Sequence, residues 1–373
     1  MTHETFVDDP WLDIVGPNGA SISRTARTWL QVETIENVVP LDVQMGALPK
    51  KTVPDVLWDA LFGQPDPSLI EIELAGGNPA TVPPMQTYAI LDAAKITNLS
   101  EMLADSELEH RCLFKGEAYH DLKDVAPWIV RLENENTFTR NLFTRSDAYW
   151  HLWDNEPGIY VRSRGALDEM WRHFRKFTRV RDETGKWFYF RFWDSIGVAS
   201  PLFEYMVDQQ EICEAWFTLP AGGQINCYLY QTFKEGIVKS VRLNDAFRQT
   251  GLGRSFIYAK PQREHSISYI LERRCYVMAR KIKQDFAADL MNFEIDQIQS
   301  RLLRCTERMK VYGIQQQEYL TPICIWDLLL GEEFEEKLGY ELVMSILKSR
   351  KREPLKFDMV KNAMLEKQQA AYG

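Results

Sequence analysis

Short apolar runs, separated by turn residues and amphipathic stretches, mark the middle of the chain from about residue 86 to residue 231. After Gly165, apolar residues recur at steps of three and four, which predicts a helix from Leu167 through Phe177. Another helix is expected between Ala93 and Leu103. Strands that alternate with helices predict an α/β layer. Four runs have the length and composition of buried strands: 88–92, 111–115, 128–132 and 158–162.

Two hairpins are predicted in the same region. The first joins 178–181 to 187–192, because the segment 182–185 has turn composition and Gly185 can adopt a positive φ. In its second arm, aromatic residues stand at every second position, which is the period of a strand. The other hairpin is expected to span 211–231 and to turn at 221–223.

The last third of the chain has a helical pattern. Between Gln262 and Tyr312 there is neither glycine nor proline, and the apolar residues recur mostly at steps of three and four. This pattern predicts one long helix, or two consecutive helices, with a single apolar stripe. Further helices are expected at 318–330, 333–349 and 355–369.

Proline and glycine are frequent before residue 86, where only short elements are predicted, among them a strand within 28–39 and a helix at 56–62. The predicted fold class is α/β, a mixed sheet with flanking helices, followed by an all-helical C-terminal lobe. We expect three segments, which are an N-terminal extension (1–85) that packs on or leads into the α/β lobe, the α/β lobe itself (86–240), and the helical lobe (255–373).

The charges are unevenly distributed. In total, 44 Lys and Arg and 53 Asp and Glu give a formal net charge of −9. Residues 1–75 hold 12 acidic and 4 basic residues, whereas 261–373 hold 17 and 18. The acidic extension is either a solvated face or a surface that meets a basic partner or the chain's own basic segment. An acidic chain argues against nucleic acid as a partner, because phosphate binding needs a basic face.

The sequence favours a cytoplasmic protein. No run of about 18 apolar residues is present, so no membrane span is expected. The segment Met1–Pro10 lacks the apolar core of a secretory signal. The six cysteines are scattered without a CxxC pair, which is typical of reduced, packed thiols rather than of a disulfide framework.

Established catalytic and cofactor motifs are absent from the sequence. The histidines show neither HExxH nor zinc-finger spacing, no GxSxG occurs, and Gly251-Leu252-Gly253 lacks the third glycine of a nucleotide-binding turn. We therefore expect no metal, no cofactor and no enzymatic activity. Arg191 and Asp194 end an aromatic run and are expected to form an internal salt bridge, with a ligand-binding arginine as the alternative.

Candidate contacts for a protein partner are tryptophan and arginine side chains, since these dominate interface hot spots. The tryptophans are Trp150, Trp153 and Trp326. The arginines are Arg301, Arg304 and Arg308. Core packing is the alternative for the tryptophans, and a solvated helix face is the alternative for the arginines. The basic cluster 348–352 suits either a helix C-terminus or an acidic partner.

Several segments resemble a known family when they are taken together and in order: Tyr88–Ala94, Leu113-Phe114, Ala126–Val130, Gly158–Tyr160, the helix from Leu167, and Arg191–Asp194. The ordered set resembles the type VI secretion effector adaptors, a family of bacterial cytoplasmic chaperones, over about residues 86–205. Ser195 follows Asp194 at a position where this family usually has proline. The family-motif residues are Asp92, Pro127, Arg191 and Asp194.

This resemblance implies a function in protein secretion without catalysis. Such adaptors bind a cognate toxin effector and help to load it onto the spike of the injection apparatus. The implied partners are the toxin and either the VgrG trimer or a PAAR-type tip. Two other classes stay open: an enzyme with an unrecognised site on the α/β layer, and a regulatory binding protein.

Overall fold

A computed structural model describes residues 28–244, 247 and 256–372, and its contacts divide the chain into two compact units. The α/β unit comprises Thr25–Tyr269. The helical unit comprises the described residues from Ile270 onward. The division falls inside the long helix α9 (Lys260–Asp285), C-terminal to the boundary expected from the sequence. Two predicted features, the first 27 residues of the extension and the Gly251–Gly253 turn, lie outside the described residues.

A seven-stranded sheet forms the centre of the α/β unit, with the strand order β1-β9-β8-β5-β2-β4-β3. Every described pairing in it is antiparallel. This sheet, its flanking helices and the helical C-terminal region confirm the predicted fold class, although the sheet that was expected to be mixed is antiparallel in its described pairings. The strands are β1 (Leu30–Ile35), β2 (Gln86–Asp92), β3 (His110–Cys112), β4 (Pro127–Leu132), β5 (Gly158–Ser163), β8 (Ile225–Gln231) and β9 (Val238–Leu243).

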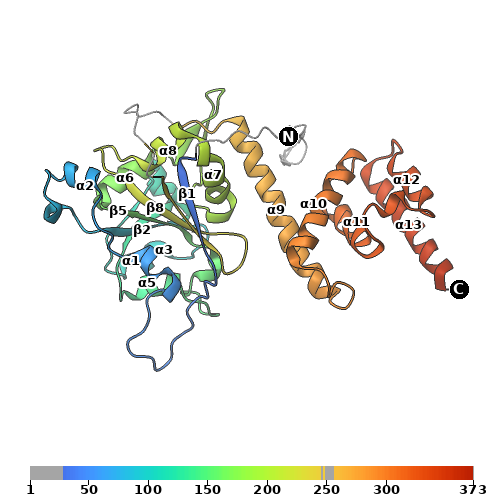
Figure 1. Cartoon of the computed structure of the whole chain (residues 1–373), viewed down its shortest axis with the longest axis horizontal. Coiled ribbons are helices and arrows are strands. Elements are labelled where there is room, and N and C mark those ends of the chain that lie inside the picture. The colour runs from blue at the N-terminus through green and yellow to red at the C-terminus, as the bar shows by residue number, and fades with distance from the viewer. Residues whose placement is uncertain (1–27, 245–246, 248–255, 373) are drawn as a thin grey trace. The chain divides into compact units, whose positions relative to one another are not determined.

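Helices cover both faces of the sheet, which explains why its central strands are continuous apolar runs (Figure 1). Alternate residues of β2 enter two different cores. Tyr88 and Ile90 join an aromatic core with α6, α7 and α8, whereas Ala89 and Leu91 join a second core with α1, α3 and α5. The helices of this unit are α1 (Trp58–Phe62), α2 (Leu69–Leu74), α3 (Leu99–Ala104), α4 (Glu117–Leu122), α5 (Thr137–Leu142), α6 (Leu167–Arg175), α7 (Ser200–Tyr205) and α8 (Gln210–Phe217).

Two sequence-based expectations in this region are wrong in part. The helix expected over 93–103 begins only at Leu99, because the chain first makes turns after β2. The hairpin expected over 211–231 has a helix, α8, as its first arm. Cys213, Trp216 and Phe217 are spaced at helical steps and are buried in the aromatic core, so helical packing decides the structure of this segment.

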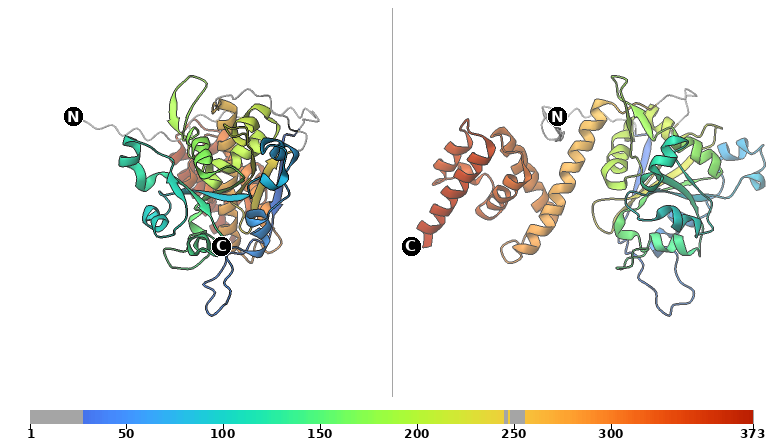
Figure 2. Two further views of the ribbon diagram at one scale, coloured as in Figure 1. Left: turned by 90° about the vertical axis from the view of Figure 1, so that its left-hand side faces the viewer. Right: turned by 180° about the vertical axis from the view of Figure 1, so that it is seen from behind.

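The hairpin formed by β6 (Arg179–Arg181) and β7 (Trp187–Tyr189) is confirmed, with Gly185 at a φ of 85° in its turn. Figure 2 shows this light-green hairpin standing out from the body of the α/β unit. Its second strand ends earlier than the alternation predicts. Phe190 and Phe192 leave the ladder and pack in the aromatic core, where Phe192 stacks on Phe174 with ring centroids 5.7 Å apart.

The helical unit contains a single core built from one face of each helix. Ile298, Leu302, Cys305 and Met309 form the buried stripe of α10, which confirms the predicted periodicity. The glycine-free stretch is two consecutive helices, α9 and α10, and the expected helix at 333–349 is reduced to a 3-10 turn and α12. The helices are α9 (Lys260–Asp285), α10 (Ile295–Val311), α11 (Gln317–Leu330), α12 (Glu341–Leu347) and α13 (Glu353–Tyr372).

The fold also shows the environment of the cysteines and the character of the helices. All six cysteines are free and buried, as expected for packed thiols. Across the described residues, none of the helices combines the length and the apolar character that a membrane span needs.

Candidate functional site

The family-motif residues meet at the end of β2. Asp92 is the last residue of β2 and is 1% exposed. The Arg191 guanidinium donates to its Oδ2 at 2.5 Å, and the Ala94 backbone N–H donates to its Oδ1 at 3.1 Å. Pro127 lies opposite Asp92 in the register of β2 and β4. A charge this deeply buried requires such partners, so Arg191 compensates Asp92 and fixes the end of the strand.

Asp194 is part of a neighbouring ion-pair group. The Lys95 ammonium lies 3.1 Å from its Oδ1 and 3.6 Å from the carboxylate of Glu156. Asp194 also accepts the Gly197 backbone N–H at 3.2 Å and so caps the π-helical turn Ser195–Ala199. The predicted Arg191–Asp194 bridge is therefore wrong, because each residue binds an opposite charge at or just after the end of β2. These ion pairs connect the end of β2 and the turn after it to the segment around Asp194.

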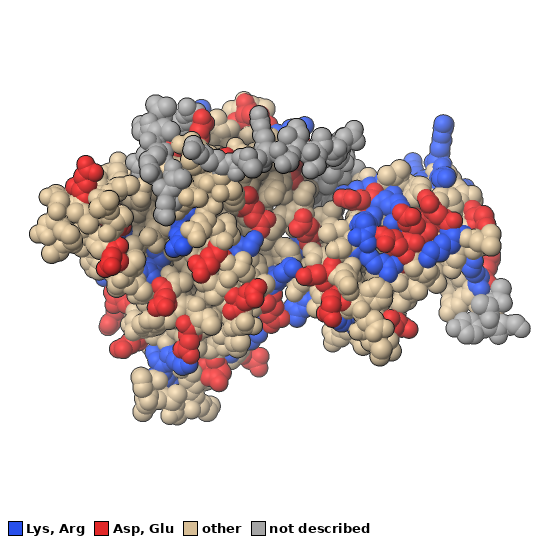
Figure 3. All heavy atoms as spheres, in the orientation of Figure 1, with Lys and Arg blue, Asp and Glu red and all other residues tan. Residues whose placement is uncertain are grey.

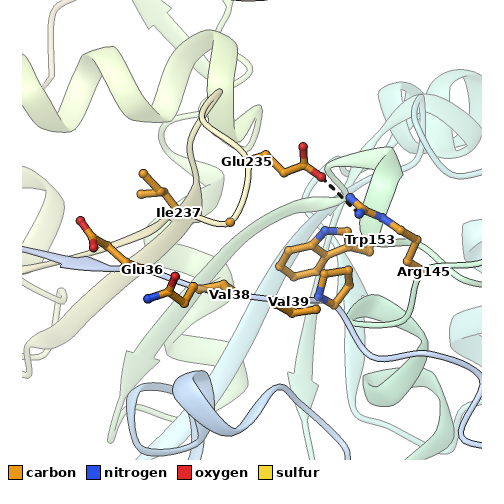
Figure 4. A pocket seen from close by; sticks show the side chains of 10 residues that line it. Glu36, Val38, Val39, Arg145, Trp153, Glu235 and Ile237 are labelled. Atoms are coloured by element: carbon orange, nitrogen blue, oxygen red, sulfur yellow. Dashed lines mark hydrogen bonds and ion pairs between the residues drawn. The ribbon is translucent and has the colours of Figure 1, made fainter. Parts of the chain in front are cut away.

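A hollow of about 470 Å³ lies at another end of the sheet, between the segment 36–40 and the turn between β8 and β9. Arg145 bounds it and pairs with Asp154 at 2.7 Å and Glu235 at 3.3 Å. The hydrogen bond that Arg145 donates to Asp154 is the main cause of a raised pKa of the Arg145 guanidinium. In Figure 4 the indole of Trp153 lies between Ile237 and Arg145, so the hollow has an apolar floor and a charged rim.

Two loops beside this hollow, residues 39–51 (the first loop) and 143–152, expose large apolar side chains. The loops are joined by backbone hydrogen bonds between Leu41 and Phe143 (2.8 Å) and between Arg145 and Leu41 (2.9 Å). Met45 is 90% exposed and Leu48 is 93% exposed. Figure 1 shows the first loop, in dark blue, projecting from the sheet. We call the exposed apolar residues of these loops the loop surface: Val39, Val43, Met45, Leu48, Tyr149 and Trp150.

The base of the first loop is held by specific polar contacts. The Gln44 side chain accepts the Lys51 backbone N–H at 2.7 Å and donates to the Lys51 carbonyl at 3.0 Å. Arg140 donates to the same carbonyl at 3.1 Å. The apolar side chains at the tip are thus presented on an anchored loop. Clusters of exposed apolar side chains mark sites of protein or ligand contact.

The structure places the three candidate tryptophans in different environments. Trp150 is 44% exposed and packs edge-on against Tyr149, with ring centroids 4.9 Å apart. Trp153 is buried in the core around Phe143, so of its two predicted environments it has core packing. Trp326 is half-buried in the helical unit and stacks on Phe357. Of the three, Trp150 alone belongs to the loop surface.

The three candidate arginines are engaged within the helical unit. Arg308 is largely buried and binds Asp327 at 2.5 Å and Glu335 at 2.6 Å. Arg304 pairs with Glu332, and Arg301 donates to the Asp327 carbonyl at 2.6 Å. Groups beyond α10 accept hydrogen bonds from all three, and the expected solvated face is limited to Arg304, which remains about half exposed. Figure 3 shows basic and acidic side chains interleaved on the visible face of this unit.

Sequence reasoning missed most of the loop surface. Met45 and Leu48 lie in a segment with proline and glycine and without apolar periodicity, so no element and no face could be assigned to them. The only available signal was large apolar residues inside a segment of turn composition. Among the described residues, no group of three or more His, Cys, Asp or Glu side chains is placed to hold a metal ion.

Comparison with known families identifies one segment of the chain. Residues 87–212 match the family model of a domain of unknown function (DUF4123). The match runs from β2 into α8 and so includes all four family-motif residues and the contiguous strands β5-β2-β4-β3. Strands β1, β8 and β9 complete the sheet from outside the match. No curated protein and no solved structure matches the chain.

Proposed function

We propose that this protein is a cytoplasmic adaptor that binds a cognate toxin effector of a type VI secretion system and helps to load it onto the VgrG or PAAR spike. Two observations support the proposal. The segment that resembles such adaptors, about 86–205, coincides with the family match at 87–212. The α/β unit also presents the loop surface, which is suited to contact with another protein.

The loop surface carries this proposal. Its most exposed residues, Met45 and Leu48, stand on a loop anchored at Leu41 and Lys51. An apolar segment of the toxin would cover these side chains and Trp150, and burial yields roughly 25 cal/mol per Å² of apolar surface. Methionine is flexible and adapts to differently shaped partners. The same contact would shield the toxin segment from aggregation before export.

The test is capture of the toxin encoded beside this protein's gene. The double variant Met45→Ser, Leu48→Ser is expected to retain at least tenfold less toxin than the unmodified chain on an affinity resin. The matched control is Leu69→Ser, Leu74→Ser, which removes two exposed leucines from α2 and is expected to retain toxin within twofold of the unmodified chain. All four side chains are exposed, so both variants should melt at the unmodified temperature.

Two results would contradict the proposal. Equal capture by the loop variant and the unmodified chain would exclude the loop surface as the contact. Equal solubility and equal secretion of the toxin in cells lacking this chain would exclude the adaptor function as a whole.

A further inference from the structure

A second hollow in the α/β unit is lined by basic residues. It has a volume of about 490 Å³ and lies between the C-terminal end of α6 and the β6–β7 hairpin. No acidic residue is among the described residues that line it, although the whole chain has a net charge of −9. We call it the basic hollow, and its lining residues are Arg172, Arg175, Lys176, Thr178, Arg179 and Trp187.

Most of these cations lack an acidic partner. Arg172 pairs with Asp168 within α6. The side chains of Arg175, Lys176 and Arg179 form no ion pair with any residue in the described part of the chain. Each lies near an aromatic ring instead, and the Arg179 guanidinium is 5.6 Å from the centroid of Trp187. Three positive charges therefore converge on one hollow without local neutralisation.

Helix electrostatics explain only part of this cluster. Cations in the last turn of a helix interact favourably with its dipole, which accounts for Arg172 and Arg175. Arg179 belongs to a strand, as does Arg181, which does not line the hollow but lies over the ring of its Trp187, so the dipole of α6 gives no reason for their presence. The β6–β7 register places Arg181 opposite Trp187 and Arg179 opposite Tyr189. The hairpin thus contributes arginines at fixed register positions, in addition to the cations at the end of α6.

Stacking on Trp187 leaves the Arg179 and Arg181 guanidinium groups able to bind a carboxylate. The Arg181 guanidinium lies 4.3 Å from the centroid of the Trp187 ring. A guanidinium over an aromatic face keeps its edge N–H groups available, and these match the two oxygens of a carboxylate. Because Arg181 already occupies a face of this indole, the ring is a poor platform for stacking a nucleic-acid base. The chemistry favours side-chain carboxylates over nucleotides.

We propose that the basic hollow binds an acidic peptide segment, a short run of Asp and Glu residues, in the protein partner. The assignment of that segment to the toxin or the spike rests on the proposed adaptor function. Whether the hollow binds an acidic peptide does not depend on the adaptor function and can be measured with the purified chain alone. The hollow and the loop surface then act as two separate contacts, one electrostatic and one apolar.

Fluorescence polarisation of a labelled peptide tests the proposal with the purified full chain alone. The probe contains six consecutive glutamates between Gly-Ser flanks, and the reference peptide has glutamines in their place. We expect binding of the glutamate peptide only, with affinity falling at least tenfold between 50 and 300 mM salt because exposed charges are screened. Equal binding of the two peptides, or binding of neither, would overturn the proposal.

Variants localise the contact. Arg175→Gln, Arg179→Gln should weaken binding of the glutamate peptide at least tenfold, and thermal melting should be unchanged because both side chains are exposed. The matched control is Lys351→Gln, Arg352→Gln, which removes two exposed charges from the basic cluster 348–352 and should leave binding within twofold. Equal losses in both double variants would mean a general charge effect and would reject the basic hollow as the site.

Two further comparisons distinguish a nucleic-acid ligand from a peptide ligand, and this binding site from the adaptor function. If a single-stranded oligothymidylate competes with the glutamate peptide and binds more tightly, the hollow is a nucleic-acid site and the peptide proposal fails. A chain that binds the glutamate peptide but never retains the toxin would overturn the adaptor function and leave this site standing. Retention of the toxin without any binding of the peptide would overturn this inference alone.

Discussion

At the scale of single residues, buried charges and their partners determine which side chains this protein cannot lose. Asp92 is almost fully buried, and its one cationic partner among the described residues is Arg191, which is separated from it by 99 residues in sequence. Arg191 is itself half exposed. Its guanidinium therefore acts mainly by satisfying a carboxylate that has no access to water.

Arg191→Met is expected to lower the free energy of unfolding by about 2 kcal/mol, because a buried carboxylate is left without its partner. Urea unfolding followed by circular dichroism measures the change. Arg172→Met is the control, since Arg172 forms an exposed pair with Asp168 one helical turn away and should cost less than about 0.5 kcal/mol. Equal effects of the two substitutions would show that Asp92 does not depend on Arg191.

His173 gives the stability of the α/β unit a defined pH dependence. It is fully buried among aromatic rings, and burial, with a smaller effect of the Lys176 charge, holds its pKa well below the usual 6.5. The unfolded chain therefore binds a proton at a higher pH than the folded chain does. We expect stability to fall as the pH is lowered through about 6.5, in unfolding experiments between pH 7.5 and 5.

Two measurements check this prediction. In the native protein the ring protons of His173 should not titrate in NMR spectra between pH 7.5 and 5.5. A native titration near pH 6.5 would contradict the burial argument. The variant His173→Gln should lose this component of the pH dependence, whatever its stability at pH 7.5.

At the scale of elements, a buried ion-pair network links α10 to α11 and to the 3-10 turn that follows it. Arg308 of α10 reaches Asp327 and Glu335, which are 1% and 0% exposed at their side chains. Burial raises the pKa of the Asp327 carboxyl, and the Arg308 charge opposes that shift. The Arg308 guanidinium offsets the cost of burying these two side chains inside the helical unit.

Arg308→Met is expected to destabilise the helical unit by about 3 kcal/mol or more, because it leaves two buried carboxylates without their cation. Arg304→Met is the matched control on the same helix. Arg304 pairs with Glu332 while about half exposed, so its loss should cost less than about 1 kcal/mol. Chemical denaturation of both variants measures the difference, and equal midpoints would refute the assigned role of the buried network.

At the scale of the whole molecule, the described chain has separate hydrophobic cores. The two cores of the α/β unit and the core of the helical unit share no residue. Units with their own cores can unfold as separate cooperative transitions. This arrangement allows a substitution to be assigned to one unit by the transition that it shifts.

We expect calorimetry to resolve two unfolding transitions. Arg191→Met should lower the midpoint of one transition, and Arg308→Met should lower the midpoint of the other. A single transition that both variants shift equally would show that the units unfold as one. The double variant should shift both transitions additively, since the two residues belong to different cores.

The whole molecule also shows why overall charge is a poor guide to individual surfaces. The chain carries a net charge of −9, yet the basic hollow has no acidic side chain among its described lining residues. Its cations come from α6 and from the hairpin that follows it. Local binding of an anionic segment is therefore compatible with an acidic protein, because exposed charges act within about a Debye length.

Local sequence patterns are sufficient to predict those elements whose pattern follows from their own burial. Strands such as β2 and β5 are covered on both faces and so appear as uninterrupted apolar runs, and α10 shows its core-facing stripe at helical steps. The sequence predicts a strand where α8 lies, because a short apolar run is compatible with a strand or a helix. Packing of this segment on the aromatic core favours the helix.

Which distant side chains meet depends on the packing of the whole fold. Asp92 binds Arg191, Trp153 is buried in a core, and backbone hydrogen bonds join Leu41 to Phe143 and Arg145. None of these outcomes follows from local spacing, since each depends on how strands and loops far apart in the chain are brought side by side. Periodicity reports which face of an element is buried, whereas partners and surfaces arise from the arrangement of the elements.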